Sequence, residues 1–246
     1  MDKAKVFVIT SWDDFTEQDF KMCELLEKYK LKGTFFVVNN WVSKDISRER
    51  LKHISEYHEI GAHTLDHTVL TGVSDDEARR QISVSKSLLE ETLGRPVVSF
   101  AYPKGCYKMK HAIMVQEANY ICARTTRPFY TTHYKNSYEI NVTLWAYPHE
   151  FKDIAGLLRL FRDSPRTILN PLLIKDWNRL GKLLFDTILE SGGVFHIFGH
   201  SWQLDEKNGW SKLEDLLAHL AFRKNVSYST LSDYVMTSRE ATEYSP

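Results

Sequence analysis

The sequence is poor in cysteine, in long apolar runs and in net charge, and each shortage excludes a class of protein. Its three cysteines, Cys23, Cys106 and Cys122, are scattered and never spaced as C-x-x-C, which argues against a disulfide framework or a cysteine-built zinc site. Lysine plus arginine equals aspartate plus glutamate at 32 each, so no net charge attracts nucleic acid. No stretch approaches the roughly 18 apolar residues of a membrane span.

The start of the chain has no long apolar run either. Val6 to Ile9 is too short for the apolar core of a signal peptide, and scattered cysteines fit a reduced compartment. We therefore expect a cytoplasmic protein with no membrane span and no nucleic-acid partner.

Strand patterns and helix patterns alternate along most of the chain. The predicted strands are Val6 to Thr10, Gly33 to Val38, Pro96 to Ala101, Tyr120 to Ala123, Gly193 to His200 and Val226 to Tyr228. The predicted helices are one capped by Thr16 and ended by Gly33, then Arg48 to Tyr57, Ser74 to Leu93 closed by Gly94, Lys108 to Ala118 and Leu213 to Phe222. Repeated β-α units predict an α/β fold with a parallel sheet or barrel.

An atypical segment at about 127–191 interrupts this alternation. We expect helices near Ile154 to Arg162 and Trp177 to Leu189, and a long loop at Phe129 to Tyr138 that could act as a lid. Because no repeat or low-complexity linker divides the chain, residues 1–246 are predicted to form a single domain.

Polar side chains follow several of the predicted strands. Asp13 and Asp14 follow the first, His63 and His67 come after the short segment Glu59 to Ala62, and His200 ends the strand that begins at Gly193. Since ligands bind at the carboxyl ends of parallel strands, these groups are expected to meet in one cleft.

Two histidines four residues apart, His63 and His67, would face the same way on a helical turn. With one carboxylate they make the ligand set of a catalytic divalent metal, although such a pair is also common on protein surfaces. Asp13 and Asp14 could likewise be a solvated turn or a helix cap. Their position after a buried strand favours a metal site, because two adjacent carboxylates stay ionised more easily beside a cation.

Two further histidines, His196 and His200, lie four apart in a predicted strand and so share a face. His200 is the better candidate for an acid because it reaches the cleft, whereas His196 lies deeper and could equally be structural.

These segments together resemble the polysaccharide deacetylase family, also called the NodB homology domain or carbohydrate esterase family 4. The family motif T-F-D-D-G is similar to Ser11-Trp12-Asp13-Asp14-Phe15, H-[ST]-x-x-H is matched by His63-Thr64-Leu65-Asp66-His67, and the fifth motif resembles Phe198-Gly199-His200-Ser201-Trp202. The similarity covers roughly residues 5 to 125 and 193 to 235.

The resemblance implies a distorted, incomplete, seven-stranded TIM-like (β/α) barrel with one divalent metal ion on Asp14, His63 and His67. It also implies Asp13 as catalytic base, His200 as catalytic acid and the backbone N–H of Lys104 as oxyanion donor. We expect zinc, although cobalt, nickel or iron suits the same ligands. The predicted substrate contacts are Trp12, Tyr102 and Trp202.

Two of the five family motifs are altered. The third, R-x-P-[YF]-G, is Ala101-Tyr102-Pro103-Lys104-Gly105 here, so the arginine that orients the base in the family is missing. Either Arg124 or Arg127 replaces it, or the base is held less firmly. The fourth, with an aspartate that tunes the catalytic histidine, is not found.

The predicted function is hydrolysis of an N-acyl amide, with an N-acetyl group on an amino sugar or glycan as the first choice of substrate. One alternative is a metal-dependent amidase acting on a non-sugar C–N bond, such as a formamide or ureide. Another is a degenerate barrel that binds glycan without catalysis, against which the retained metal, base and acid residues argue. The partner is thus a carbohydrate or a small amide, and no oligomeric state is predicted.

Overall fold

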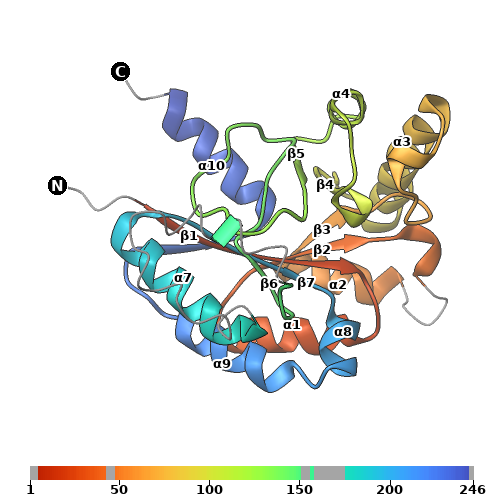
Figure 1. Ribbon diagram of the computed structural model, residues 1–246. Coiled ribbons are helices and arrows are strands. Elements are labelled where there is room, and N and C mark those ends of the chain that lie inside the picture. Colours follow the sequence, from red (N-terminus) through yellow and green to blue (C-terminus); the bar gives the residue numbers. More distant parts are fainter. Residues whose placement is uncertain (1–4, 43–47, 151–155, 158–174, 244–246) are drawn as a thin grey trace.

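Parallel strands form the centre of the computed structural model, which describes residues 5–42, 48–150, 156–157 and 175–243 (Figure 1). Seven strands follow the order β5-β4-β3-β2-β1-β7-β6, and β8 pairs with β1 beside them. The strands are β1 (Val6–Asp14), β2 (Gly33–Val37), β3 (Glu59–Ala62), β4 (Ser99–Ala101), β5 (Cys122–Arg124), β6 (Leu144–Trp145), β7 (Gly193–Gly199) and β8 (Val226–Ser229). All their ladders are parallel.

The segment between β5 and β6 connects the two ends of this strand order. Thr125 donates its N–H to the carbonyl oxygen of Ile140 at 2.7 Å, and Thr143 donates to the carbonyl oxygen of His196 in β7 at 2.8 Å. The segment therefore runs from β5 towards β7 with only one isolated bridge, between Arg124 and Ile140. The result is the predicted distorted, TIM-like α/β barrel in a single domain.

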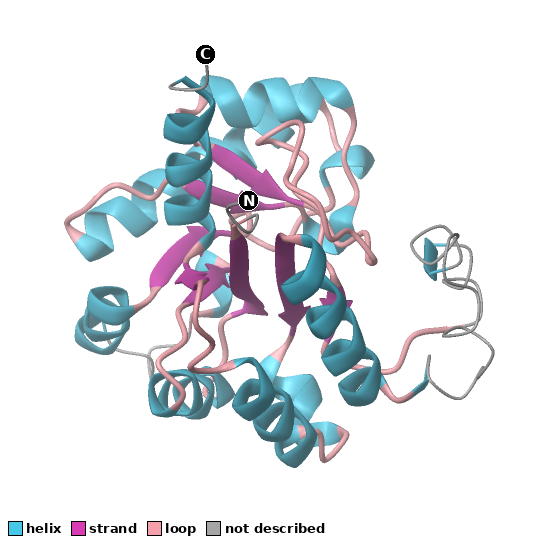
Figure 2. Cartoon of the chain, turned by 90° about the vertical axis from the view of Figure 1, so that its left-hand side faces the viewer, coloured by secondary structure: helices cyan, strands magenta, loops and turns pink. Residues whose placement is uncertain are grey.

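Helices surround the sheet (Figure 2). They are α1 (Gln18–Lys28), α2 (Arg48–Tyr57), α3 (Asp75–Leu93), α4 (Met109–Glu117), α7 (Trp177–Ser191), α8 (Ser201–Glu206), α9 (Trp210–Leu220) and α10 (Leu231–Glu243), with short 3₁₀ turns η1 (Asn39–Trp41), η2 (Leu70–Gly72) and η3 (Pro103–Gly105). Ser74 caps α3 by accepting the N–H of Glu77, and Gly94 ends it at φ +69°, as predicted. Within the described ranges, no helix is both long and apolar enough to cross a membrane.

The two faces of β1 pack into two different clusters. Val6, Val8 and Trp12 lie in the large cluster with the surrounding helices, whereas Phe7 and Ile9 pack with residues of α10. Since successive side chains of a strand point to opposite faces, Asp13 lies on the same side as Phe7 and Ile9. This alternation separates Asp13 from Trp12, which lies on the helix-facing side.

Several local predictions need correction. Thr16 does not cap α1, whose N-cap is Glu17, and Gly33 begins β2 instead of ending the helix. The strand β6 and the helices α8 and α10 were not predicted. The helix predicted at Trp177 to Leu189 is α7, and the one predicted at 154–162 lies almost wholly outside the described residues.

The loop from Phe129 to Tyr138 is not a lid. The carbonyl oxygen of Thr131 accepts the N–H of Val194 at 2.8 Å, near the start of β7. The loop therefore extends to the end of the barrel opposite the carboxyl ends of the strands, which its length alone could not reveal.

Candidate metal centre

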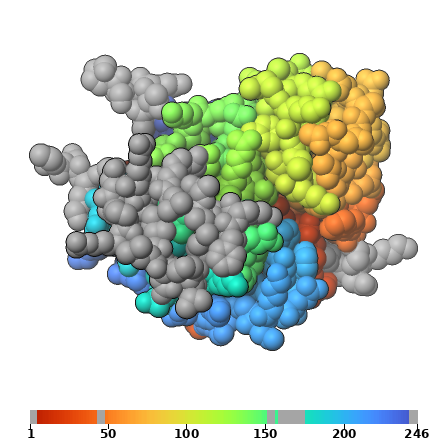
Figure 3. Space-filling model, in the orientation of Figure 1, coloured from red at the N-terminus to blue at the C-terminus, as the bar shows by residue number. Residues whose placement is uncertain are grey.

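The predicted site residues converge where the parallel strands end. Asp13 and Asp14 are the last residues of β1, His63 follows β3, Arg124 ends β5 and His200 follows β7. All but Arg124 line a pocket of about 460 Å³. In the space-filling view, red N-terminal residues are visible between the yellow-green and blue segments, so parts of the chain far apart in sequence meet on this face (Figure 3).

Asp14, His63 and His67 form a group that can hold a metal ion. One ligand atom from each lies within 4.8 Å of the others. Asp14 Oδ1 and His63 Nε2 are buried and have no hydrogen-bond partner. Buried polar atoms are rarely left unpaired, and a divalent cation among these three residues would satisfy both. The donor set therefore fits one divalent ion.

The orientation of His63 suits a ligand. Its Nδ1 lies 2.8 Å from the carbonyl oxygen of Ala101, an acceptor, so the ring proton sits on Nδ1 and the lone pair of Nε2 faces the site. Burial lowers the pKa of His63 and of His67, which keeps both rings in the neutral form that a metal ligand needs.

The histidine loop does not form the helical turn that the spacing suggested. Thr64 has φ +63° and His67 has φ +56°, both in the left-handed region that non-glycine residues seldom adopt. Thr64 Oγ1 accepts the N–H of Thr68 at 3.0 Å, and the carbonyl oxygen of Leu65 accepts the N–H of Asn40 at 3.0 Å. Asp14 at the end of β1 has φ +81°. Asp14 and His67 thus occupy backbone conformations that their surroundings must hold in place.

Asp13 pairs with Arg124, not with Arg127. The guanidinium of Arg124 is fully buried, donates to Asp13 Oδ1 and lies over the rings of Phe36 and Phe198. Arg127 lines a different pocket. Burial raises the pKa of Asp13, but the charge of Arg124, together with the hydrogen bond that it donates, opposes this rise, and that pKa lies below its ordinary 3.8. Asp13 is therefore a charged carboxylate beside the candidate metal ligands.

His200 and Trp202 both approach Asp14 from the segment after β7. His200 Nε2 lies 3.9 Å from Asp14 Oδ2, and the indole N–H of Trp202 donates to the same oxygen at 3.0 Å. No described residue bonds His200 Nδ1, so the aspartate of the fourth motif has no replacement in the described part of the chain. His196 is buried beside Ser11, and burial lowers its pKa to about 3, which fits a structural histidine.

Two predicted substrate contacts lie elsewhere. Trp12 is fully buried on the helix-facing side of β1 and donates its indole N–H to Thr10 Oγ1 at 3.1 Å. Tyr102 is also buried, with its ring stacked on Tyr107 and its hydroxyl donating to the carbonyl oxygen of Tyr138. Neither lines the pocket. Trp12 precedes Asp13 in β1 and therefore points to the opposite face of the sheet. Lys104, in η3 at φ +57°, and Trp202 do line it.

Several aromatic residues of the pocket were missed. Trp41 is 50% exposed, and its ring lies 5.0 Å from that of His67. Trp145 stacks on Tyr147 at 5.3 Å and donates its indole N–H to the carbonyl oxygen of Thr126. Trp41 follows a predicted strand, so the rule that found the histidines would have found it. Trp145 lies on a two-residue strand with no sequence signal of its own.

The fold and the site together define the class of protein: an α/β barrel with an Asp-His-His metal site at the carboxyl ends of its strands. A family model described as polysaccharide deacetylase matches residues 2–123, and the motifs and fold agree with it. The chain belongs to the polysaccharide deacetylase family.

Relatives share only part of their length with this chain. It is 30% identical over 105 residues to the peptidoglycan-N-acetylglucosamine deacetylase of Bacillus cereus, a match that covers 41% of this chain and 47% of that protein. It is 30% identical over 88 residues to the uncharacterized protein YlxY of Bacillus subtilis, covering 36% of this chain and 27% of that protein. The chain thus spans less than half the length of these curated relatives.

Solved structures agree on the fold. A protein of Mycobacterium smegmatis classed with the polysaccharide deacetylases has a TM-score of 0.71 at 17% identity, covering 100% of this chain and 93% of that one. The Xyl-CE4 domain of a xylanase from the hindgut metagenome of Trinervitermes trinervoides has a TM-score of 0.60 at 14% identity, covering 97% and 92%. Identities this low support the fold alone.

Proposed function

We propose that this protein is a metal-dependent hydrolase that removes an N-acetyl group from an amino sugar or glycan, with zinc as the ion and the cytoplasm as its location. One observation carries the proposal. Asp14 Oδ1 and His63 Nε2 are buried without hydrogen-bond partners next to Asp13, which Arg124 holds in its charged form. Metal-assisted hydrolysis requires metal-ligand atoms next to a charged carboxylate that can act as a base.

The side chains divide the chemistry among them. A divalent ion in the Asp14, His63 and His67 set would polarise the acyl oxygen and lower the pKa of a water molecule. Asp13 takes the proton of the attacking water, and Arg124 keeps that carboxylate oriented. The backbone N–H of Lys104 stabilises the oxyanion, and His200 gives a proton to the departing amine.

The pocket walls support a carbohydrate substrate. Trp41, Trp145, Tyr147 and Trp202 all line it, and flat aromatic faces suit the apolar faces of sugar rings. The name of the Bacillus cereus relative also indicates action on an N-acetylated glucosamine unit. An N-acetyl sugar is therefore preferred to a small non-sugar amide.

A substrate panel tests this function. Acetate or formate release is measured from acetylated and formylated amino sugars and from simple formamides and ureides, with and without a chelator. We expect acetate to be released from the N-acetyl sugars, and we expect the chelator to abolish this release. Asp13→Asn should lower kcat by about 10²–10⁴-fold while elemental analysis still finds the ion, because only the base is removed.

Other outcomes would redirect the assignment. Turnover confined to formamides or ureides would indicate an amidase. Glycan binding with no turnover by the metal-loaded protein would indicate a degenerate barrel. Full activity of Asp13→Asn would remove Asp13 as the base.

A further inference from the structure

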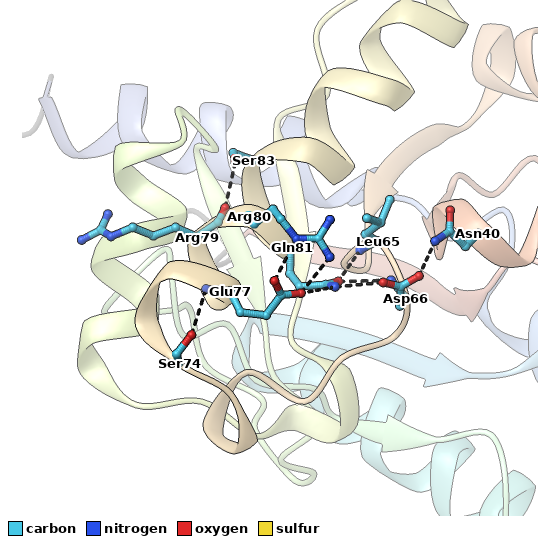
Figure 4. Close-up of polar contacts among 9 residues, drawn as sticks. All are labelled: Asn40, Leu65, Asp66, Ser74, Glu77, Arg79, Arg80, Gln81 and Ser83. Atoms are coloured by element: carbon cyan, nitrogen blue, oxygen red, sulfur yellow. Dashed lines mark hydrogen bonds and ion pairs between the residues drawn. The ribbon is translucent and has the colours of Figure 1, made fainter.

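A single buried glutamine of α3 holds the loop that carries both histidines (Figure 4). Gln81 is 1% exposed, and its Oε1 accepts the N–H groups of Leu65 at 3.0 Å and Asp66 at 3.2 Å. Its Nε2 donates to Asp66 Oδ2 and to Glu77 Oε1, each at 2.9 Å. These four bonds use both donors and both lone pairs of the amide.

The same loop is tied on its other side to η1. The second carboxylate oxygen of Asp66 accepts from the side-chain amide of Asn40, whose backbone N–H donates to Leu65. The next residue, Trp41, places its ring 5.0 Å from that of His67. Asp66 therefore links α3 to the pocket wall that Trp41 forms.

The end of this network on α3 is fixed as well. Arg80 donates two bonds of 2.8 Å to the carboxylate of Glu77, and Ser74 caps the backbone N–H of Glu77. Glu77 thus offers Gln81 an oxygen that is already held in the first turn of the helix. Gln81 is consequently restrained from both sides.

A loop with two left-handed non-glycine residues needs such restraint. Thr64 and His67 adopt φ +63° and +56°, and between them the buried N–H of Leu65 and the part-buried N–H of Asp66 need an acceptor. An aliphatic side chain at position 81 would leave both unpaired. A glutamate could accept from them but could not donate to Asp66 and Glu77.

We propose that Gln81 is a positioning residue of the metal centre, which keeps His63 and His67 turned towards Asp14 and connects them through Asp66 to Trp41. The proposal rests on the metal site of the proposed function, but not on any substrate. Groups that orient metal ligands from behind typically contribute a factor of about 10–100 in metal affinity.

The test measures metal binding by the full chain. Gln81→Met keeps the length of the side chain and removes all four bonds. We expect its Zn²⁺ affinity, measured by competition with a chromophoric chelator, to fall by about 10–100-fold. The visible absorption spectrum of the Co²⁺-loaded variant should also change, because the ligand geometry relaxes.

A second variant and a control separate positioning from plain stability. Gln81→Glu keeps the two accepted bonds and serves if Gln81→Met does not fold; its Zn²⁺ affinity should fall on the order of 10-fold. Ile82→Val removes one methyl group from the core cluster on the same helix and should lower Tm with no change in Zn²⁺ affinity.

Two results would overturn the inference. Parent-like Zn²⁺ affinity and Co²⁺ spectra in both Gln81 variants, with only Tm lowered, would make Gln81 a stabilising residue and leave the proposed function intact. Absence of Zn²⁺ binding by the parent protein would remove the metal site, and the proposed function with it.

Discussion

Asp13 owes its charge chiefly to Arg124. It is buried at the end of β1, where an isolated carboxylate would be protonated, and the fully buried guanidinium of Arg124 supplies the compensating charge. Arg124 Cζ lies 5.0 Å from the ring centroid of Phe36 and 4.5 Å from that of Phe198. Each member of the pair therefore depends on the other for its presence in the barrel interior.

Removing Arg124 should change the pH dependence of catalysis. In Arg124→Gln the burial of Asp13 is no longer offset, so the pKa of Asp13 rises and the base becomes protonated at higher pH. We expect the acid limb of the kcat/KM profile to move up by about 1–3 pH units. The free energy of unfolding should fall by about 3–5 kcal/mol, because a buried charge loses its partner.

The arginine that lines another pocket provides the control. Arg127→Gln should leave the acid limb where it is in the parent protein. An unshifted acid limb in Arg124→Gln would mean that Asp13 is not the group whose ionisation governs the rate.

The candidate metal ligands Asp14, His63 and His67 could be predicted from the sequence because they lie in short motifs. The choice between Arg124 and Arg127 could not. Arg124 faces Asp13 only because β5 pairs with β4 in the register that sets Arg124 opposite Ala101. Trp12 failed as a substrate contact for a related reason. The strand continues to Asp14, so Trp12 and Asp13 must point to opposite faces.

At the scale of elements, a buried carboxylate joins α1 to α8. Asp19, in the first turn of α1, accepts from the N–H of Thr16 at 2.6 Å and from the hydroxyl of Ser201, the first residue of α8. Ser201 lies between His200 and Trp202, the two residues that approach Asp14. The junction therefore supports the side of the pocket that carries the proposed acid.

This junction should make folding stability depend on pH. Burial raises the pKa of Asp19 to about 7, although hydrogen bonds from Ser201 and Thr16 oppose the rise. The folded state thus holds this proton more tightly than the unfolded chain, whose pKa is the ordinary 3.8. The stability that protonated Asp19 contributes is complete below that value and is lost as the pH rises through about 7.

Asp19→Asn removes this titration. Urea unfolding in the presence of a chelator, at pH 5 and pH 8, should show a smaller fall in the free energy of unfolding with rising pH in the variant than in the parent protein. An equal fall in the free energy of unfolding in the variant and the parent protein would show that Asp19 is not the group that binds the proton.

Elements with local signals were predicted well, and elements that depend on distant pairing were not. The helix at Arg48–Tyr57 and the capped helix after Ser74 follow from periodicity and end residues within the segments themselves. By contrast β6 is two residues long and exists because Leu144 and Trp145 pair with β7. A strand of two residues has no sequence pattern from which it could be predicted.

Across the whole molecule, the two ends of the barrel have separate tasks. Leu231, Tyr234 and Val235 of α10 pack with Phe7 and Ile9 in the first half of β1, whereas the candidate site occupies the opposite end of that strand. In barrels of this kind the carboxyl ends of the strands carry the chemistry. Substitutions in the α10 contact should therefore act on stability and not on the pocket.

The ligand set also couples the metal to the folded state as a whole. Asp14 comes from β1 and the two histidines from the loop after β3, so the three meet only once β1, β2 and β3 have paired. An ion bound by all three has little affinity for the unfolded chain. Its binding free energy consequently adds to that of folding.

Metal removal should therefore lower the thermal stability of the entire domain. With free Zn²⁺ at about 100 times Kd, the gain is about 2.7 kcal/mol, or about 5–10 °C in Tm for a chain of this size. Calorimetry with Zn²⁺ and with chelator measures it. Asp14→Asn tolerates the left-handed backbone and can still accept from Trp202 but loses the charged ligand oxygen, so most of the shift should vanish. Equal Tm values with and without Zn²⁺ in the parent protein would mean that these three side chains bind no ion.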